Sequence, residues 1–421
     1  MRVKSLQLRV AASDVLHLHP LSVHREEGVY LVGARAASGY VSTSESGAMA
    51  VRLLSEGLAV GAVHKRMEEV LGTSNFTLVP LLEKLLASGL VRAVGEQELK
   101  QGNRRQAGIP FQLHERYVSG LFSSPAIAGY ILAVSAAVGL LLLQNGYLLR
   151  PSEIFANTKY SVLGALVFVI GIVNGAKHEL AHAVAAAYLG VTARFSIGHR
   201  FLFPVLQTDL TDLWTVSRNK RFIAYAAGMI SDLLTMAAII IVSPLASWLA
   251  RMSHLAVIEK AVPLVLTLTF LLAASQILWQ FNIFVRTDVY YILANALNCR
   301  NLHGDAKAYL RGLAAGIARA LGLPGGDAMR HRPALRIRMY AIVVAIGYAL
   351  SAVYFASYLA GTFYVLSAGA MASTRALRLD GADKIAIALP LLIAIAVVAY
   401  SKYREMRSDR TVYHIRSLGT L

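Results

Sequence analysis

The chain of 421 residues is 56% hydrophobic and 15% charged, with a mean hydropathy of +0.54. Soluble domains carry about 25% charged residues, so this composition excludes a protein that is soluble along its whole length. The net charge of +17 is compatible with nucleic-acid binding, and the single cysteine, Cys299, excludes an intrachain disulfide and a cysteine-based metal cluster.

The first 121 residues carry short mixed segments instead of long apolar runs. Residues 1–20 contain no apolar stretch, so we expect an N-terminal tail without a cleavable signal peptide. The patterns that follow predict strands and short helices, in this order: strands at 29–32 and 40–42, helices at 46–54, 60–70 and 77–88, and a strand at 90–94. This order predicts a small winged-helix-like α+β domain over residues 21–97.

Short motifs are spread through this domain. His19-Pro20 precedes Gly28-Val-Tyr-Leu-Val, Ser46-Gly47 follows, and Ala87-Ser-Gly-Leu-Val closes the segment. With these motifs, about 80 residues resemble the PqqD-like peptide-binding domains. The resemblance implies binding of the leader of a ribosomally made peptide along a strand edge, through backbone hydrogen bonds.

Two other functions are open to a winged helix here, namely DNA binding and simple packing against the rest of the chain. The third predicted helix, 77–88, carries Lys84 as its single basic residue. Recognition helices of DNA-binding domains need several basic side chains, so this composition argues against a nucleic-acid partner.

The remainder of the chain, 122–421, follows a basic linker at 98–121 and is predicted to be a membrane domain. Uncharged apolar runs long enough to cross a bilayer core of about 30 Å recur along it. They predict six transmembrane helices, with cores at 126–147, 161–187, 222–247, 261–281, 340–366 and 385–400. The fold is therefore predicted to be mainly α, a polytopic membrane protein with a small α+β domain at its N-terminus.

The loops between the predicted spans differ in basic content. Lys and Arg number five in 191–221, nine in 282–338 and five in 401–421, against two or three in each loop on the opposite side. Cytoplasmic loops carry such an excess. The sequence therefore predicts a multi-pass plasma-membrane protein with both termini in the cytoplasm.

A polar motif, His178-Glu179-Leu-Ala-His182, interrupts the second predicted span. Histidines four residues apart lie on one face of a helix, so both imidazoles can bind one Zn²⁺. Glu179 is then placed to act as general base on water that the metal acidifies. Ionisable groups in a span are expensive to bury, so a catalytic zinc site is favoured over a purely structural polar cluster.

Catalytic zinc sites take a third protein ligand and keep one position open. Asp288 follows the fourth span on the predicted cytoplasmic side, at the same depth as His182. Asp209, Asp212 and Asp232 also lie on that side, after the motif helix or near the start of the third span. Depth in the membrane does not decide which of these four aspartates is the third ligand.

A second motif, Asn282-Ile-Phe-Val-Arg-Thr-Asp288-Val, accompanies the first. Together they make residues 160–300 resemble the site-two protease family of intramembrane zinc metalloproteases, in which the second motif is Asn-Pro followed by Asp-Gly. The resemblance implies that Asp288 is the third zinc ligand and that Asn282 binds the substrate backbone. A helix–helix hydrogen bond is the alternative role of Asn282. Residues 207–228 also resemble a bacterial branch associated with peptide maturation.

The second motif departs from the family pattern at two positions. Ile283 stands in place of Pro and Val289 in place of Gly, and Met229 stands where many relatives have Pro. These departures predict a less unwound chain beside the ligand, which bears on substrate access more than on zinc binding.

Two neighbours of the motif complete the predicted site. Lys177 is turned about 100° from His178 on a helix, so we expect it to point away from the metal and pair with an acid or reach the interface. Residues 191–204 alternate loosely and contain Gly198 and Pro204, which fits either a hairpin that presents an edge to an extended substrate or a simple loop.

These features favour an intramembrane zinc metalloendopeptidase that cleaves a membrane-associated or leader-bearing peptide near the cytoplasmic face. Its expected cofactor is Zn²⁺, and its expected partners are a peptide or membrane-protein substrate and the lipid bilayer. A peptide-binding or export accessory that retains metal without cleaving is the first alternative. A membrane-tethered regulator whose winged helix binds DNA is the second.

Overall fold

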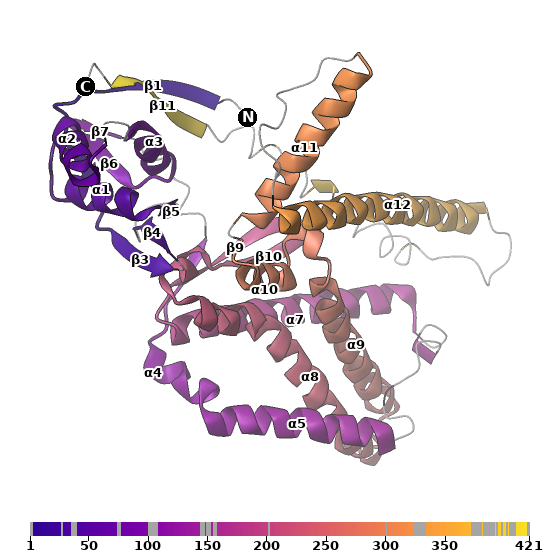
Figure 1. Cartoon of the computed structure of the whole chain (residues 1–421). Helices are drawn as coiled ribbons and strands as arrows, with labels where there is room; N and C mark the ends of the chain where they lie inside the picture. Colours follow the sequence, from indigo (N-terminus) through magenta and orange to yellow (C-terminus); the bar gives the residue numbers. More distant parts are fainter. Residues whose placement is uncertain are drawn as a thin grey trace.

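The computed structural model describes residues 3–26, 28–34, 40–73, 77–99, 108–143, 158–200, 203–299, 301–322, 334–371 and 410–418, with isolated positions between them. Its described part is mainly helical and carries four small sheets. The short N-terminal helices and strands gather at one end of the long helices (Figure 1).

The N-terminal region contains every element predicted for 29–94. Its strands and helices are β2 (Leu16–Leu18), β3 (Ser22–Glu26), β4 (Val29–Gly33), β5 (Tyr40–Thr43), α1 (Glu45–Ser55), α2 (Val60–Leu71), α3 (Val79–Ala87), β6 (Val91–Val94) and β7 (Gln97–Glu98). Two antiparallel sheets form, in the orders β3-β4-β5 and β2-β6-β7. β2, β3 and β7 were not predicted. β3 is exposed and polar and shows no apolar alternation, and β2 and β7 are only three and two residues long.

An apolar core joins these elements, with Leu54, Met67 and Leu82 fully buried in it. Ser44 accepts a hydrogen bond from the backbone of Gly47 and so caps the start of α1. The winged-helix and PqqD-like assignments of this region stay predictions, as do the domain boundaries.

The two ends of the described chain lie side by side. β1 (Val3–Val10) and β11 (Arg410–Leu418) form a parallel pair, in which Val3 faces Arg410 and Leu8 faces Ile415. Figure 1 shows this ribbon next to α3. Residues 1–20, predicted as a tail, therefore contain β1 and β2.

Five helices are long and apolar enough to cross a membrane, which indicates a membrane protein. They are α5 (Ser124–Leu143), α7 (Tyr160–Tyr188), α8 (Arg218–Met252), α9 (Ala256–Gln280) and α12 (Leu335–Met371), and they coincide with five of the predicted spans. The sixth predicted span, 385–400, lies outside the described residues apart from isolated positions. Continuous helices suit lipid because each backbone group is bonded within its own segment.

A hairpin follows α7. It consists of β9 (Ala193–Arg200) and β10 (Phe203–Asp209), and β8 (Ile109–Phe111) joins it to give the order β10-β9-β8. The hairpin alternative for 191–204 is thus the observed one, and part of the predicted linker 98–121 is a strand. β10 forms one edge of this sheet and packs against α7.

The chain breaks between α9 and the next helix. α9 ends at Gln280, a 3-10 turn η3 (Ile283–Val285) follows, and Arg286 has a left-handed backbone with φ 61°. Despite Ile283 and Val289, the helix is therefore interrupted beside Asp288. The remaining helical segments are α4 (Glu115–Val118), η1 (Ser119–Phe122), η2 (Thr211–Thr215), α10 (Asp288–Ala296) and α11 (Leu302–Ala320).

Candidate metal centre

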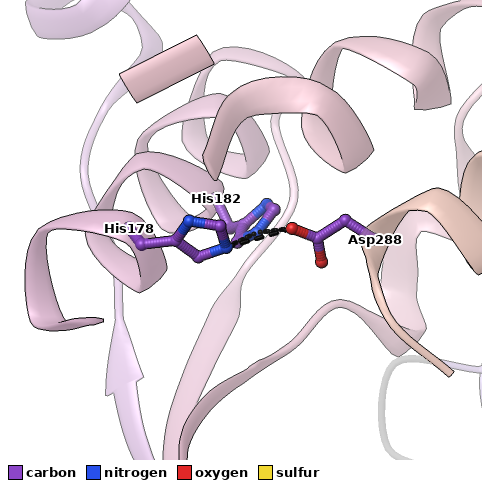
Figure 2. A group of neighbouring side chains, drawn as sticks. All are labelled: His178, His182 and Asp288. Carbon is purple, nitrogen blue, oxygen red and sulfur yellow. Dashed lines mark hydrogen bonds and ion pairs between the residues drawn. The ribbon is translucent and has the colours of Figure 1, made fainter. Parts of the chain in front are cut away.

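Three predicted ligands meet between α7 and the start of α10 (Figure 2). Asp288 Oδ2 lies 3.0 Å from His178 Nε2 and 3.1 Å from His182 Nε2, and the two Nε2 atoms are 3.3 Å apart. All three side chains are buried. Two histidines one helical turn apart on α7 and an aspartate 106 positions beyond His182 therefore form one cluster.

The cluster fits a zinc ion. A tetrahedral zinc bound at about 2 Å to each ligand holds the ligand atoms about 3.3 Å apart, and the measured separations are 3.0, 3.1 and 3.3 Å. Two imidazoles and one carboxylate also form a donor set used by catalytic zinc sites. A Cβ on Gly228 of α8 would collide with both Nε2 atoms, so glycine keeps this space free.

The outer nitrogens of both histidines are bonded. Nδ1 of His182 lies 2.7 Å from the carbonyl oxygen of Ala224, which can only accept, so Nδ1 carries the proton. Nδ1 of His178 lies 2.7 Å from Asp232 Oδ2. Such partners orient a ligating ring and leave Nε2 for the metal.

Asp288 is held by a residue that the sequence analysis missed. The backbone N–H of Asp288 donates to Oε1 of Gln280 (3.0 Å), and Thr287 Oγ1 donates to the Gln280 carbonyl (2.6 Å). Nε2 of the same amide lies 3.4 Å from His178 Nε2. An amide at the end of an otherwise apolar span is the signal that could have indicated Gln280.

The electrostatic surroundings keep Asp288 ionised. Burial raises the pKa of its carboxyl, but the His182 and His178 imidazoles lower it further than burial raises it. Its pKa therefore lies well below the ordinary value. A carboxylate is the form that binds metal.

Glu179 faces the hairpin. Its Oε2 accepts a 2.7 Å hydrogen bond from the backbone N–H of Thr208 in β10, and its carbonyl accepts from Thr208 Oγ1 at 3.0 Å. Glu179 is half-buried, next to His178 in the chain. The predicted general base thus lies between the metal ligands and a sheet edge.

The other predicted candidates lie elsewhere. Asn282 is half-buried and donates to the carbonyl of Trp279, so its amide closes the end of its own helix. Asp209 accepts from Thr211 in the turn after β10, and Asp212 lies in η2. Asp232 contacts the outer side of His178. Among the described residues, His178, His182 and Asp288 are the group that could hold a metal ion.

The chain is similar to a bacterial protein named "Putative peptide zinc metalloprotease protein YydH", from Bacillus subtilis (strain 168). The two are 25% identical over 159 residues, which cover 37% of this chain and 54% of the relative. The match thus spans about half the length of that relative. No family model matches the chain, and no solved structure does.

Proposed function

We propose that this chain is a membrane-embedded zinc endopeptidase of site-two protease type, which cuts a membrane-associated or leader-bearing peptide near the cytoplasmic face. One observation carries the proposal. His178, His182 and Asp288 converge in the apolar part of the chain, and Glu179 follows the first of them. The likeness to a protein named as a peptide zinc metalloprotease supports the same chemistry.

Each residue of the centre has a separate role in this proposal. His178, His182 and Asp288 hold zinc, which when bound acidifies water and polarises a carbonyl. Glu179 takes a proton from the attacking water and delivers it to the leaving amine. Gln280 holds the backbone of Asp288, so that the carboxylate stays directed at the two imidazoles.

We assign the extended substrate to the edge of β10. β10 is an outer strand of its sheet, and Thr208 within it touches Glu179. A peptide added along a strand edge is held by backbone hydrogen bonds. Glu179 already accepts from the Thr208 N–H on this edge, so a peptide along the rest of the edge would lie beside the general base.

The N-terminal region offers a second edge for a leader. β3 is the outer strand of its sheet and is largely exposed. At its end, Glu26 pairs with Arg221 at the start of α8 (3.1 Å), and the rings of His24 and Tyr40 lie against Trp214. A leader on β3 would thus be tethered to the helix that packs against the metal ligands, which raises the local concentration of the scissile segment.

The topology in this proposal has six spans and cytoplasmic termini in the plasma membrane. The β1–β11 pair supports both ends on one side, and an odd number of spans would separate them. Cysteine labelling at positions 155, 255 and 378, in a Cys299→Ser background, should report the outer side. Labelling from the cytoplasm at any of them would contradict this arrangement.

Cleavage by protein reconstituted in liposomes tests the function. Glu179→Gln should lower the rate by about 10²–10⁴, the range for general acid–base catalysis, and leave one zinc per chain. Glu259→Gln, an exposed glutamate on α9, is the matched control and should cleave normally. The products of a peptide library would be identified by mass. Wild-type protein that holds zinc and yields no Glu179-dependent product would favour a non-cleaving accessory.

A further inference from the structure

A fully buried carboxylate lies behind the metal centre. Asp232 of α8 is 0% exposed, within a helix long and apolar enough to cross a membrane. Its Oδ2 lies 2.7 Å from His178 Nδ1, and its Oδ1 lies 2.9 Å from Lys177 Nζ. An unpaired charge at such a position costs several kcal/mol, so these two contacts account for its presence.

The Lys177 side chain binds this carboxylate and its neighbours on α8. Its ammonium donates to Asp232 Oδ1, to the carbonyl of Ser231 (3.2 Å) and to Thr235 Oγ1 (2.5 Å). These contacts use all three of its donors. All three acceptors lie on α8, so the Lys177 side chain leaves α7 towards α8 and not towards Asp288.

The two contacts of Asp232 have different consequences. The contact with His178 Nδ1 makes this nitrogen the protonated one and fixes the plane of the ring, so Nε2 faces Asp288 and His182. The contact with Lys177 holds the other carboxylate oxygen, so the carboxylate cannot rotate away from the ring. His182 has a neutral backbone carbonyl in the corresponding place.

We propose that Asp232 and Lys177 form a positioning pair, in which Asp232 orients His178 for the metal and Lys177 orients and neutralises Asp232. Asp232 is thus a positioning residue and not a fourth ligand. The inference rests on the metal centre of the proposed function but not on peptide cleavage. It also explains why a lysine can precede a metal-binding histidine in an apolar segment.

The test uses zinc and cobalt(II) alone, with full-length protein in detergent micelles. Zinc Kd is measured by competition with a chelator, and the cobalt(II) absorption spectrum reports ligand geometry. Asp232→Asn keeps the volume of the side chain and removes its charge. It should weaken zinc binding about 10–100-fold and alter the cobalt spectrum, as expected for loss of an outer partner of a ligating histidine.

Lys177→Met supplies a second, independent variant. It should weaken zinc binding by about tenfold, the lower end of the same range. In an Asp232→Asn background it should have a smaller effect than in the wild type, because Lys177 acts through Asp232. Ser243→Ala, which removes another buried polar group from α8, is the matched control and should leave both readouts unchanged.

The outcomes separate this inference from the proposed function. If His178→Ala keeps wild-type zinc affinity, the metal centre itself is wrong. If His178→Ala loses zinc while a folded Asp232→Asn keeps the wild-type Kd and spectrum, the positioning pair is wrong and the centre stands. If Asp232→Asn does not fold, an unchanged Kd and spectrum in Lys177→Met would overturn the pair.

Discussion

Residues 3–99 and the helical region 124–371 both bury apolar side chains, but the helical region buries polar ones as well. In the N-terminal region the buried residues are apolar, among them Leu31, Met67 and Leu82, and Glu26, a charged side chain that is 12% exposed, is paired with Arg221. In the helical region, large apolar side chains such as Leu142 and Leu143 are over 80% exposed, whereas every polar residue recorded as buried in the described chain lies between Asn174 and His303.

This difference changes what a buried polar residue signifies. A charged side chain on the surface of 3–99 is solvated, so its position alone carries little functional information. An ionisable side chain buried among spans is costly and needs a partner, so it indicates a site. Four of the buried polar residues, His178, His182, Gln280 and Asp288, meet at one point.

The largest expected effect is loss of the metal. His182→Ala removes one of three protein ligands, so zinc affinity should fall by more than the roughly 100-fold typical of an outer partner. Metal analysis after gel filtration measures this loss. His64→Ala, on α2 of the N-terminal region, is the matched control and should retain one zinc per chain. If His182→Ala retained one zinc per chain, His182 would not be a metal ligand, and the contrast between the two regions would be wrong.

The next largest expected effect is the difference in stability loss between truncating a buried leucine and truncating an exposed one. Leu82→Ala removes a fully buried side chain from the N-terminal core and should destabilise that region by about 2–5 kcal/mol. Leu142→Ala on α5 removes a side chain that is 83% exposed and should cost less than about 0.5 kcal/mol. Thermal unfolding of both variants in detergent measures the difference. Equal losses would show that α5 packs against a partner.

A third prediction compares two amides. Gln280→Leu removes the acceptor for the Asp288 backbone and should weaken zinc binding about 10–100-fold. Asn282→Leu, two positions further on, should leave zinc affinity unchanged, because its amide bonds to Trp279. Chelator competition on both proteins measures this contrast. The reverse ranking would show that Asn282, and not Gln280, holds the metal centre.

The smallest expected effect is a pH dependence of stability, which arises from His303 in α11, outside the spans. Burial, with smaller contributions from Lys307 and Arg286, lowers the pKa of His303 from 6.5 to about 4. The unfolded chain then binds a proton that the folded chain does not, so stability should fall between pH 6.5 and 4, by about 1 kcal/mol at pH 5.5. His303→Asn should reduce this fall in Tm. An identical pH profile in the variant would contradict the assignment.

The sequence alone located much of the architecture. Hydropathy predicted five spans that coincide with α5, α7, α8, α9 and α12, and local patterns predicted the three short helices of the N-terminal region. The spacing of His178 and His182 also placed both imidazoles on one face of a helix. All these features depend on residues close together in the chain, where local geometry is sufficient.

Only the tertiary structure decided between the distant residues. Depth left four aspartates open as the third ligand, and the resemblance to a protease family pointed to Asp288. The fold brings Asp288 to the histidines, turns Asp232 to the outer side of His178, and adds Gln280, which was not predicted, as the partner of the Asp288 backbone. It also pairs β1 with β11. The physical reason is that the role of a side chain depends on which helices pack together and how each helix is rotated. Local sequence patterns do not contain this information for residues more than 50 positions apart.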